Sequence, residues 1–115
     1  MRVDRPESLR PGDVFAWLKP PHWKRPNTGH VGFLVSAARP HPEYAGVWLM
    51  KIADATSIPH QGDSRDKDGE GGYGTGVIAF QFEPDGQAVG YGWYGARQPP
   101  KSFVPTRVVF GRVRR

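Results

Sequence analysis

The sequence predicts a mainly β domain, a small curled antiparallel sheet or barrel of about six strands with long loops. Two observations predict it: the chain has 15 glycines and 12 prolines, and its apolar residues fall in short runs between turn signals. No stretch shows the spacing of an amphipathic helix. Because 115 residues suffice for one core and not for two, we expect a single domain over 1–115.

Six short apolar runs are the expected strands. A turn at residues 9–13, LRPGD, leads into the first run, which is apolar at every position and is therefore predicted to be buried on both faces. Neither face of the third run is polar, so we expect that strand to be central. In chain order the expected strands are 14–18, 30–35, 47–56, 77–82, 88–94 and 103–113.

The segments between these runs are expected to be irregular. Three prolines exclude regular structure from 19–27, and a segment of Pro, His, Glu and Gly at 39–46 predicts a turn or loop. We expect a lead-in at 1–9, a long loop at 57–74 and a basic tail at 111–115.

Composition limits the chemistry. The chain has no cysteine, which excludes a disulfide, a thiolate metal site and a thiol nucleophile. Its 16 Lys and Arg against 11 Asp and Glu give a net charge of +5; this favours either a solvated basic surface or an anionic partner such as nucleic acid or a cell-wall polymer. No apolar run approaches the roughly 20 residues of a membrane span, and the N-terminus has no apolar signal segment. These features leave the localisation open.

The Asp-rich part of the long loop resembles a calcium-binding loop only at first sight. Ser64 takes the first ligand position, and Thr75 stands where a bidentate Glu is needed. We therefore expect no metal site and no cofactor.

A histidine and a carboxylate end two of the runs. Residues 28–35, TGHVGFLV, place His30 at the start of one strand, and residues 52–57, IADATS, place Asp54 at the end of another. In a hairpin centred near residue 42, from (39 + 46)/2, partner numbers sum to 84, which makes His30 and Asp54 direct cross-strand neighbours. A carboxylate beside an imidazole is the orienting pair of a general base. A strand-end histidine satisfied by hydrogen bonds and a carboxylate that caps a turn are the alternatives.

Three motifs in this order resemble the barrel half of NlpC-type and CHAP-type papain-like peptidases: LRPGDV at 9–14, TGHVGFLV at 28–35 and IADATS at 52–57. The pattern DATSIPH, DSR and GYGTG over 54–76 is similar to a bacterial subgroup of these proteins, and the likeness covers about 9–93. The resemblance implies the β half of an α+β papain-like fold.

The resemblance also implies a reaction and its residues. His30 would be the general base and Asp54 the imidazole-orienting residue of a peptidase or amidase, often one acting on peptidoglycan peptides. In the family the nucleophile is a Cys at the start of a helix, and this sequence has no Cys. The resemblance therefore implies either a chain completed by a Cys-bearing N-terminal segment or partner chain, or a barrel that is inactive alone.

Four further residues are candidates for substrate binding. His60, Asp63 and Arg65 lie in the long loop and Trp23 in the proline-rich loop. The first three are expected either to bind substrate around the histidine or to form ion pairs that stabilise the loop. Trp23 is expected either to form a groove wall or to pack onto the barrel.

Two other classes of function stay open. The first third of the chain is also similar to MazF-type toxin barrels, which implies a small basic barrel that binds RNA. Trp23, Tyr91, Trp93 and Tyr94 are then expected either to be exposed and stack on bases or to belong to the core. The other class is a structural partner subunit. A barrel without a helical half would expose an apolar face, so we also expect self-association.

Overall fold

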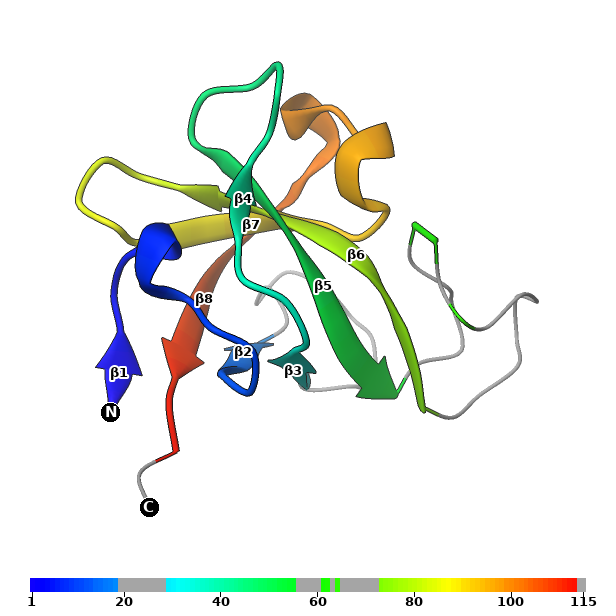
Figure 1. Cartoon of the computed structure of the whole chain (residues 1–115). Coiled ribbons are helices and arrows are strands. Elements are labelled where there is room, and N and C mark those ends of the chain that lie inside the picture. The colour runs from blue at the N-terminus through cyan, green and yellow to red at the C-terminus, as the bar shows by residue number, and fades with distance from the viewer. Residues whose placement is uncertain (19–28, 56–60, 63, 65–72, 114–115) are drawn as a thin grey trace.

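The computed structural model describes residues 1–18, 29–55, 61–62, 64 and 73–113. In this part of the chain the backbone forms eight strands and three short 3-10 turns, η1 (Pro6–Ser8), η2 (Gly95–Arg97) and η3 (Pro100–Ser102), and no α-helix (Figure 1). No described helix is long and apolar enough to cross a lipid bilayer. The strands are β1 (Arg2–Val3), β2 (Val14–Leu18), β3 (Gly29–Leu34), β4 (Arg39–Pro40), β5 (Val47–Ala55), β6 (Tyr73–Phe82), β7 (Ala88–Gly92) and β8 (Val104–Gly111).

Six of these strands close into an antiparallel barrel. Their order is β8-β2-β3-β5-β6-β7, and β7 pairs back onto β8. The two remaining strands lie outside the ring, where β1 pairs with β8 and β4 pairs with β5. The mainly β prediction is confirmed, because each of the six predicted strands is a strand of the barrel.

The predictions for the segments outside the six strands are partly wrong. The lead-in contains β1, which pairs with the last strand, and the turn segment at 39–46 begins with β4. The expected loop at 57–74 ends earlier than predicted, because β6 starts at Tyr73. These elements were missed because a two-residue strand has no periodicity, and because the glycines at the start of β6 are typical of loops.

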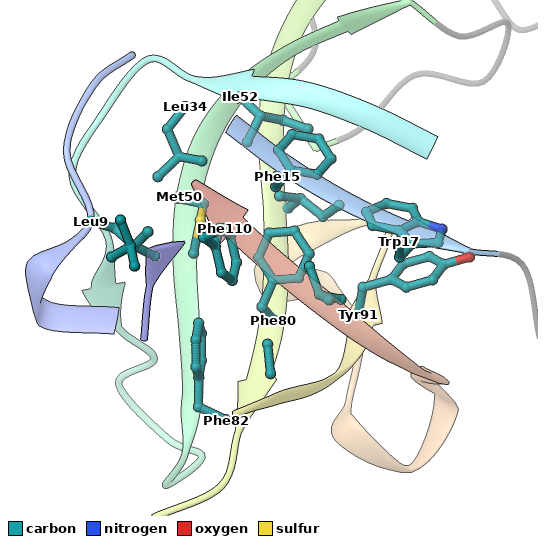
Figure 2. Close-up of a cluster of buried hydrophobic side chains, with 14 residues drawn as sticks. Leu9, Phe15, Trp17, Leu34, Met50, Ile52, Phe80, Phe82, Tyr91 and Phe110 are labelled. Carbon is teal, nitrogen blue, oxygen red and sulfur yellow. The ribbon is translucent and has the colours of Figure 1, made fainter. Parts of the chain in front are cut away.

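The interior of the barrel is filled by large apolar side chains from all six strands. Figure 2 shows this cluster, with Trp17 and Tyr91 lying side by side at one end and Leu9 at the other. The expectation that 14–18 is buried on both faces is wrong. Phe15 and Trp17 point inward and are 0% and 6% exposed, whereas Leu18 is 74% exposed. The run was ambiguous because the outward residues of β2 are apolar too.

Strand β5 is central, as predicted. It pairs with β3, β4 and β6, and its inward residues Met50 and Ile52 are fully buried. Its outward residues near the start of the strand belong to a second, smaller apolar cluster on the outside of the barrel. That cluster contains Val47, Leu49 and Ala79, with Tyr44, Val77, Ala96 and Phe103 packed against it.

One end of the barrel is fastened by a buried ion pair. Asp13 is 2% exposed and accepts hydrogen bonds from Arg112 Nε and Nη2, both at 2.9 Å, and from the Arg10 backbone N–H. Arg112 also donates to the Ser8 carbonyl, and its own carbonyl accepts a hydrogen bond from the N-terminus of Met1. The Arg112 N–H also donates to the Met1 carbonyl at 2.7 Å, so the N-terminus lies beside the residue that follows β8. Arg112, the second residue of the expected basic tail, is therefore attached to the barrel by its side chain.

This ion pair changes the protonation of both groups. Burial raises the pKa of Asp13, but the hydrogen bonds and charge of Arg112, with the Arg10 N–H, outweigh burial and hold that pKa below 3.8. The hydrogen bond to Asp13 raises the pKa of Arg112. Asp13 is therefore a carboxylate in the folded protein at neutral pH.

Candidate functional site

The site lies at the opposite end of the barrel, where β3 begins and β5 ends. His30 Nε2 and Asp54 Oδ2 are 2.7 Å apart. The Asp54 side chain has no exposed surface, and that of His30 is 17% exposed. The predicted contact between His30 and Asp54 is confirmed, and it joins a buried carboxylate to an imidazole that reaches the surface.

The predicted register is wrong by two residues. Asp54 pairs directly with Gly32, so partner numbers between β3 and β5 sum to 86 rather than 84. His30 therefore lies diagonal to Asp54 on the same face of the sheet. Because side chains alternate with a period of two, a shift of two residues keeps both side chains on the inner face.

The shift comes from the connection between β3 and β5. Arg39 pairs with Leu49, so partner numbers between β4 and β5 sum to 88 and the turn is centred on residue 44. Between β3 and β4 the Ser36 Oγ, in place of a backbone carbonyl, accepts the Lys51 N–H at 3.0 Å. The turn centre alone would raise the sum from 84 to 88, and this irregularity lowers it to 86 between β3 and β5, which leaves the shift of two.

Two glycines in β3 allow this arrangement. Gly29 has a φ of +151°, and a Cβ there would overlap the Trp17 carbonyl oxygen. A Cβ on Gly32 would lie 2.6 Å from the Phe15 ring and 2.8 Å from the Ala53 carbonyl oxygen. The glycines therefore let β3 approach β2 closely and leave space for Phe15 beside the pair.

Aromatic rings surround the imidazole. Trp17 is the direct cross-strand partner of His30, with ring centroids 5.2 Å apart. Trp93, just after β7, is also at 5.2 Å, and Phe15 is at 6.1 Å. Tyr91 stacks on Trp17 with ring centroids 4.1 Å apart (Figure 2). These rings pack around the imidazole and, with the burial of Asp54, keep the hydrogen bond in a medium of low dielectric constant, which strengthens the bond.

The arrangement suits proton transfer. An ionised Asp54 only accepts hydrogen bonds; in that state Nε2 carries the proton and Nδ1 of a neutral His30 is the basic nitrogen. Among the described residues no Ser or Thr hydroxyl bonds to His30, and no group of three or more His, Cys, Asp or Glu is placed to hold a metal. The described part of the site therefore contains an imidazole bonded to a buried carboxylate.

The four predicted substrate-binding residues, Trp23, His60, Asp63 and Arg65, lie outside the described residues. Sequence reasoning missed the aromatic neighbours of His30. A prediction that paired the strand at 14–18 with the strand at 30–35 would have placed Trp17 opposite His30. Trp93 lies near His30 only because β7 pairs with β8 and closes the barrel.

The expected stacking surface for RNA is mostly interior. Tyr91 is 6% exposed within the core, and Trp93 packs against that core. Tyr94 is 43% exposed and lies 5.8 Å from the Arg97 guanidinium. The interpretation of Tyr91 as an exposed stacking residue is therefore wrong.

Comparisons with protein-family models, with curated proteins and with solved structures gave no match. The molecule is a small, closed, six-stranded antiparallel β-barrel without cysteine, and the geometry at His30 carries the argument about its function.

Proposed function

We propose that this barrel is the histidine-bearing half of a papain-like thiol hydrolase that cleaves peptide or amide bonds, with peptidoglycan peptides as the substrate class. The observation that carries the proposal is the 2.7 Å bond between His30 and a fully buried Asp54. A buried carboxylate is costly unless it is paired. A barrel that only needed to fill this end would place an apolar side chain there, so the retained pair supports a role in proton transfer.

In this proposal His30 moves one proton in two directions. Nδ1 takes the proton of a thiol, and the thiolate attacks the substrate carbonyl carbon. The protonated His30 then donates to the leaving amine as the C–N bond breaks, which leaves a thioester. A water molecule gives a proton to Nδ1 and its oxygen to the acyl carbon, and the thiol leaves with the proton of His30. Asp54 holds the ring and stabilises the imidazolium at each stage.

The thiol comes from outside these 115 residues, because the sequence has no cysteine. A segment of the same gene product or a partner chain would supply it at the open side of His30. We expect the chain alone to show no hydrolysis of peptide or amide bonds.

The experiment first reads the coding sequence on both sides of the chain for a Cys-bearing segment and then joins that segment to the chain, as one polypeptide or as two co-expressed chains. Two quantities are measured: release of amines from peptidoglycan fragments and alkylation of the thiol by iodoacetamide over a range of pH. We expect His30→Ala to abolish hydrolysis and to slow alkylation below neutral pH, because the thiolate needs the imidazolium. Asp54→Asn is expected to lower hydrolysis about 100-fold or more, as loss of an orienting carboxylate does in hydrolytic triads.

His41→Gln is the matched control. His41 lies in the turn between β4 and β5, where its Nδ1 accepts the backbone N–H of Glu43 at 3.0 Å. Hydrolysis should be unchanged in this variant. The proposal is overturned if no adjacent segment or partner supplies a cysteine, or if the joined protein hydrolyses its substrate equally well with His30→Ala.

A further inference from the structure

Trp93 lies against the imidazole from outside the strands that carry the site. It follows the last residue of β7 and is half-buried against the barrel core, whereas Trp17 is a buried residue of β2. The ring centroids of His30 and Trp93 are 5.2 Å apart, and the ring planes are tilted by 56°. In tilted aromatic pairs the positive edge of one ring meets the negative face of the other. A positive charge on the imidazole strengthens such a contact.

The two indoles form a corner that holds the imidazole. Trp17 and Trp93 are 6.3 Å apart and nearly perpendicular, at 83°, and His30 lies 5.2 Å from each of them. Both distances to His30 are within the roughly 6 Å over which a cation and an aromatic ring attract each other. Tyr91 stacks on Trp17 at 4.1 Å and lies 6.3 Å from Trp93, so it packs against both indoles.

The segment that carries Trp93 is fixed by close packing and by a hydrogen bond. A Cβ on Gly92, just before Trp93, would overlap the Phe103 ring. Just after Trp93 the chain enters η2, where the Ala96 N–H donates to Gln61 Oε1 at 2.6 Å. The backbone on both sides of Trp93 is therefore held in place, which fixes the position from which the indole reaches His30.

The imidazole has a carboxylate on one side and aromatic rings on the others. Asp54 of β5 is the described anion that bonds to His30. Arg97, a cation of the segment after Trp93, lies 5.8 Å from the Tyr94 ring. The described rings around the imidazole and its indoles are Phe15, Trp17, Trp93 and Tyr91, of which Tyr91 alone has a titratable group. A positive charge on His30 is thus stabilised by Asp54 and by the faces of these rings.

We propose that Trp93 is a positioning residue for His30 and that its indole stabilises the imidazolium form. The inference rests on the proposed function, in which His30 carries a positive charge between loss of the thiol proton and departure of the amine. Trp93 acts through His30 and forms no bond to the reacting atoms. Because Trp93 is half-buried, its replacement costs less stability than replacement of the buried Trp17.

The test uses the full chain alone and needs no cysteine. Trp93→Phe keeps an aromatic face, and Trp93→Leu fills a similar volume without one, so the two variants separate the face of the ring from its bulk. The His30 ring signals are followed by NMR as the chain is acidified. We expect the proton affinity of His30 to be about five times lower in Trp93→Leu than in Trp93→Phe. Equal proton affinities in the two variants, or the reverse order, overturn the inference.

Trp48→Leu is the matched control. Trp48 is also half-buried against the core, but it lies near the start of β5, whereas Asp54 lies near its end. Its replacement should change the proton affinity of His30 less than about twofold, because strand residues that far apart do not touch. If Trp48→Leu lowers that affinity as much as Trp93→Leu does, the effect comes from loosened packing and the inference is wrong.

The joined protein that carries the thiol separates this inference from the proposed function. If His30→Ala leaves its hydrolysis unchanged, the proposed function fails, and the NMR titration still decides the role of Trp93. If His30→Ala abolishes hydrolysis, we expect Trp93→Leu to hydrolyse about fivefold more slowly than Trp93→Phe. Equal rates for those two variants would contradict the role of Trp93 alone.

Discussion

Each end of the barrel buries a carboxylate, and the two carboxylates have partners of different chemistry. Asp13 is held by Arg112, which keeps its charge at any physiological pH. Asp54 is held by His30, an imidazole, and imidazoles exchange protons near neutral pH. The Asp13 end also joins the N-terminus to the last strand, whereas the His30 end is lined by aromatic rings. The difference supports the proposal that one pair stabilises the fold and that the other transfers protons.

The largest effect on stability is expected from Gly29→Ala at the His30 end. A Cβ at Gly29 would overlap the Trp17 carbonyl oxygen, and the φ of +151° is unfavourable for alanine. We expect a loss of about 4 kcal/mol in the free energy of unfolding, from backbone strain and steric overlap together. Urea denaturation measures it.

Gly12→Ala makes the same change at the Asp13 end. Gly12 has a φ of +92°, but a Cβ added there would meet nothing within 4 Å, so only the dihedral cost of about 1–2 kcal/mol applies. Equal losses in the two variants would show that close approach of β2 and β3 at Gly29 has no energetic role.

Asp13→Ala is expected to cost about 3 kcal/mol, because it leaves the Arg112 guanidinium and the Arg10 N–H without their buried acceptor. The control is Asp85→Ala, which removes one exposed turn bond to the Gln87 N–H and should cost about 1 kcal/mol or less. Both losses are read from chemical denaturation at neutral pH. If Asp13→Ala lowers the free energy of unfolding no more than the control does, the ion pair does not stabilise the fold.

The lowered pKa of Asp13 gives this end a pH dependence with a definite sign. Between the folded pKa and the unfolded value near 3.8 the unfolded chain binds more protons, so the stabilisation is complete above that range and is lost as pH falls through the folded pKa. Asp13→Asn lacks this contribution at every pH. Urea midpoints of the two proteins should therefore approach each other as pH falls from 3.8 through the folded pKa, and a gap that stays constant over this range would contradict the assignment.

Much of the barrel was predictable because its signals are local. Apolar runs and turn residues located all six strands of the ring, and the turn at 9–13 correctly preceded β2. The Asp13–Arg112 pair was not predictable, since the two residues are 99 positions apart and no pattern connects them. Only the pairing of β2 with β8 brings them together.

The site was predictable in part for the same reason. His30 and Asp54 flank one connection, so a simple hairpin predicted their contact even with the wrong register. The rings around His30 come from β2 and from beyond β7, and closure of the barrel determines their positions. The rings around His30 could therefore be identified only from the tertiary structure.

His30→Gln is the smallest expected change in stability and the sharpest test of the comparison. A glutamine amide can still donate to Asp54, so the buried carboxylate keeps a partner and the loss should be about 1 kcal/mol or less. In the joined protein that carries the thiol, the same variant should abolish hydrolysis, because an amide does not exchange a proton. A loss of stability as large as that of Asp13→Ala would mean that both ends are structural. The two pairs would then differ in residue type but not in role.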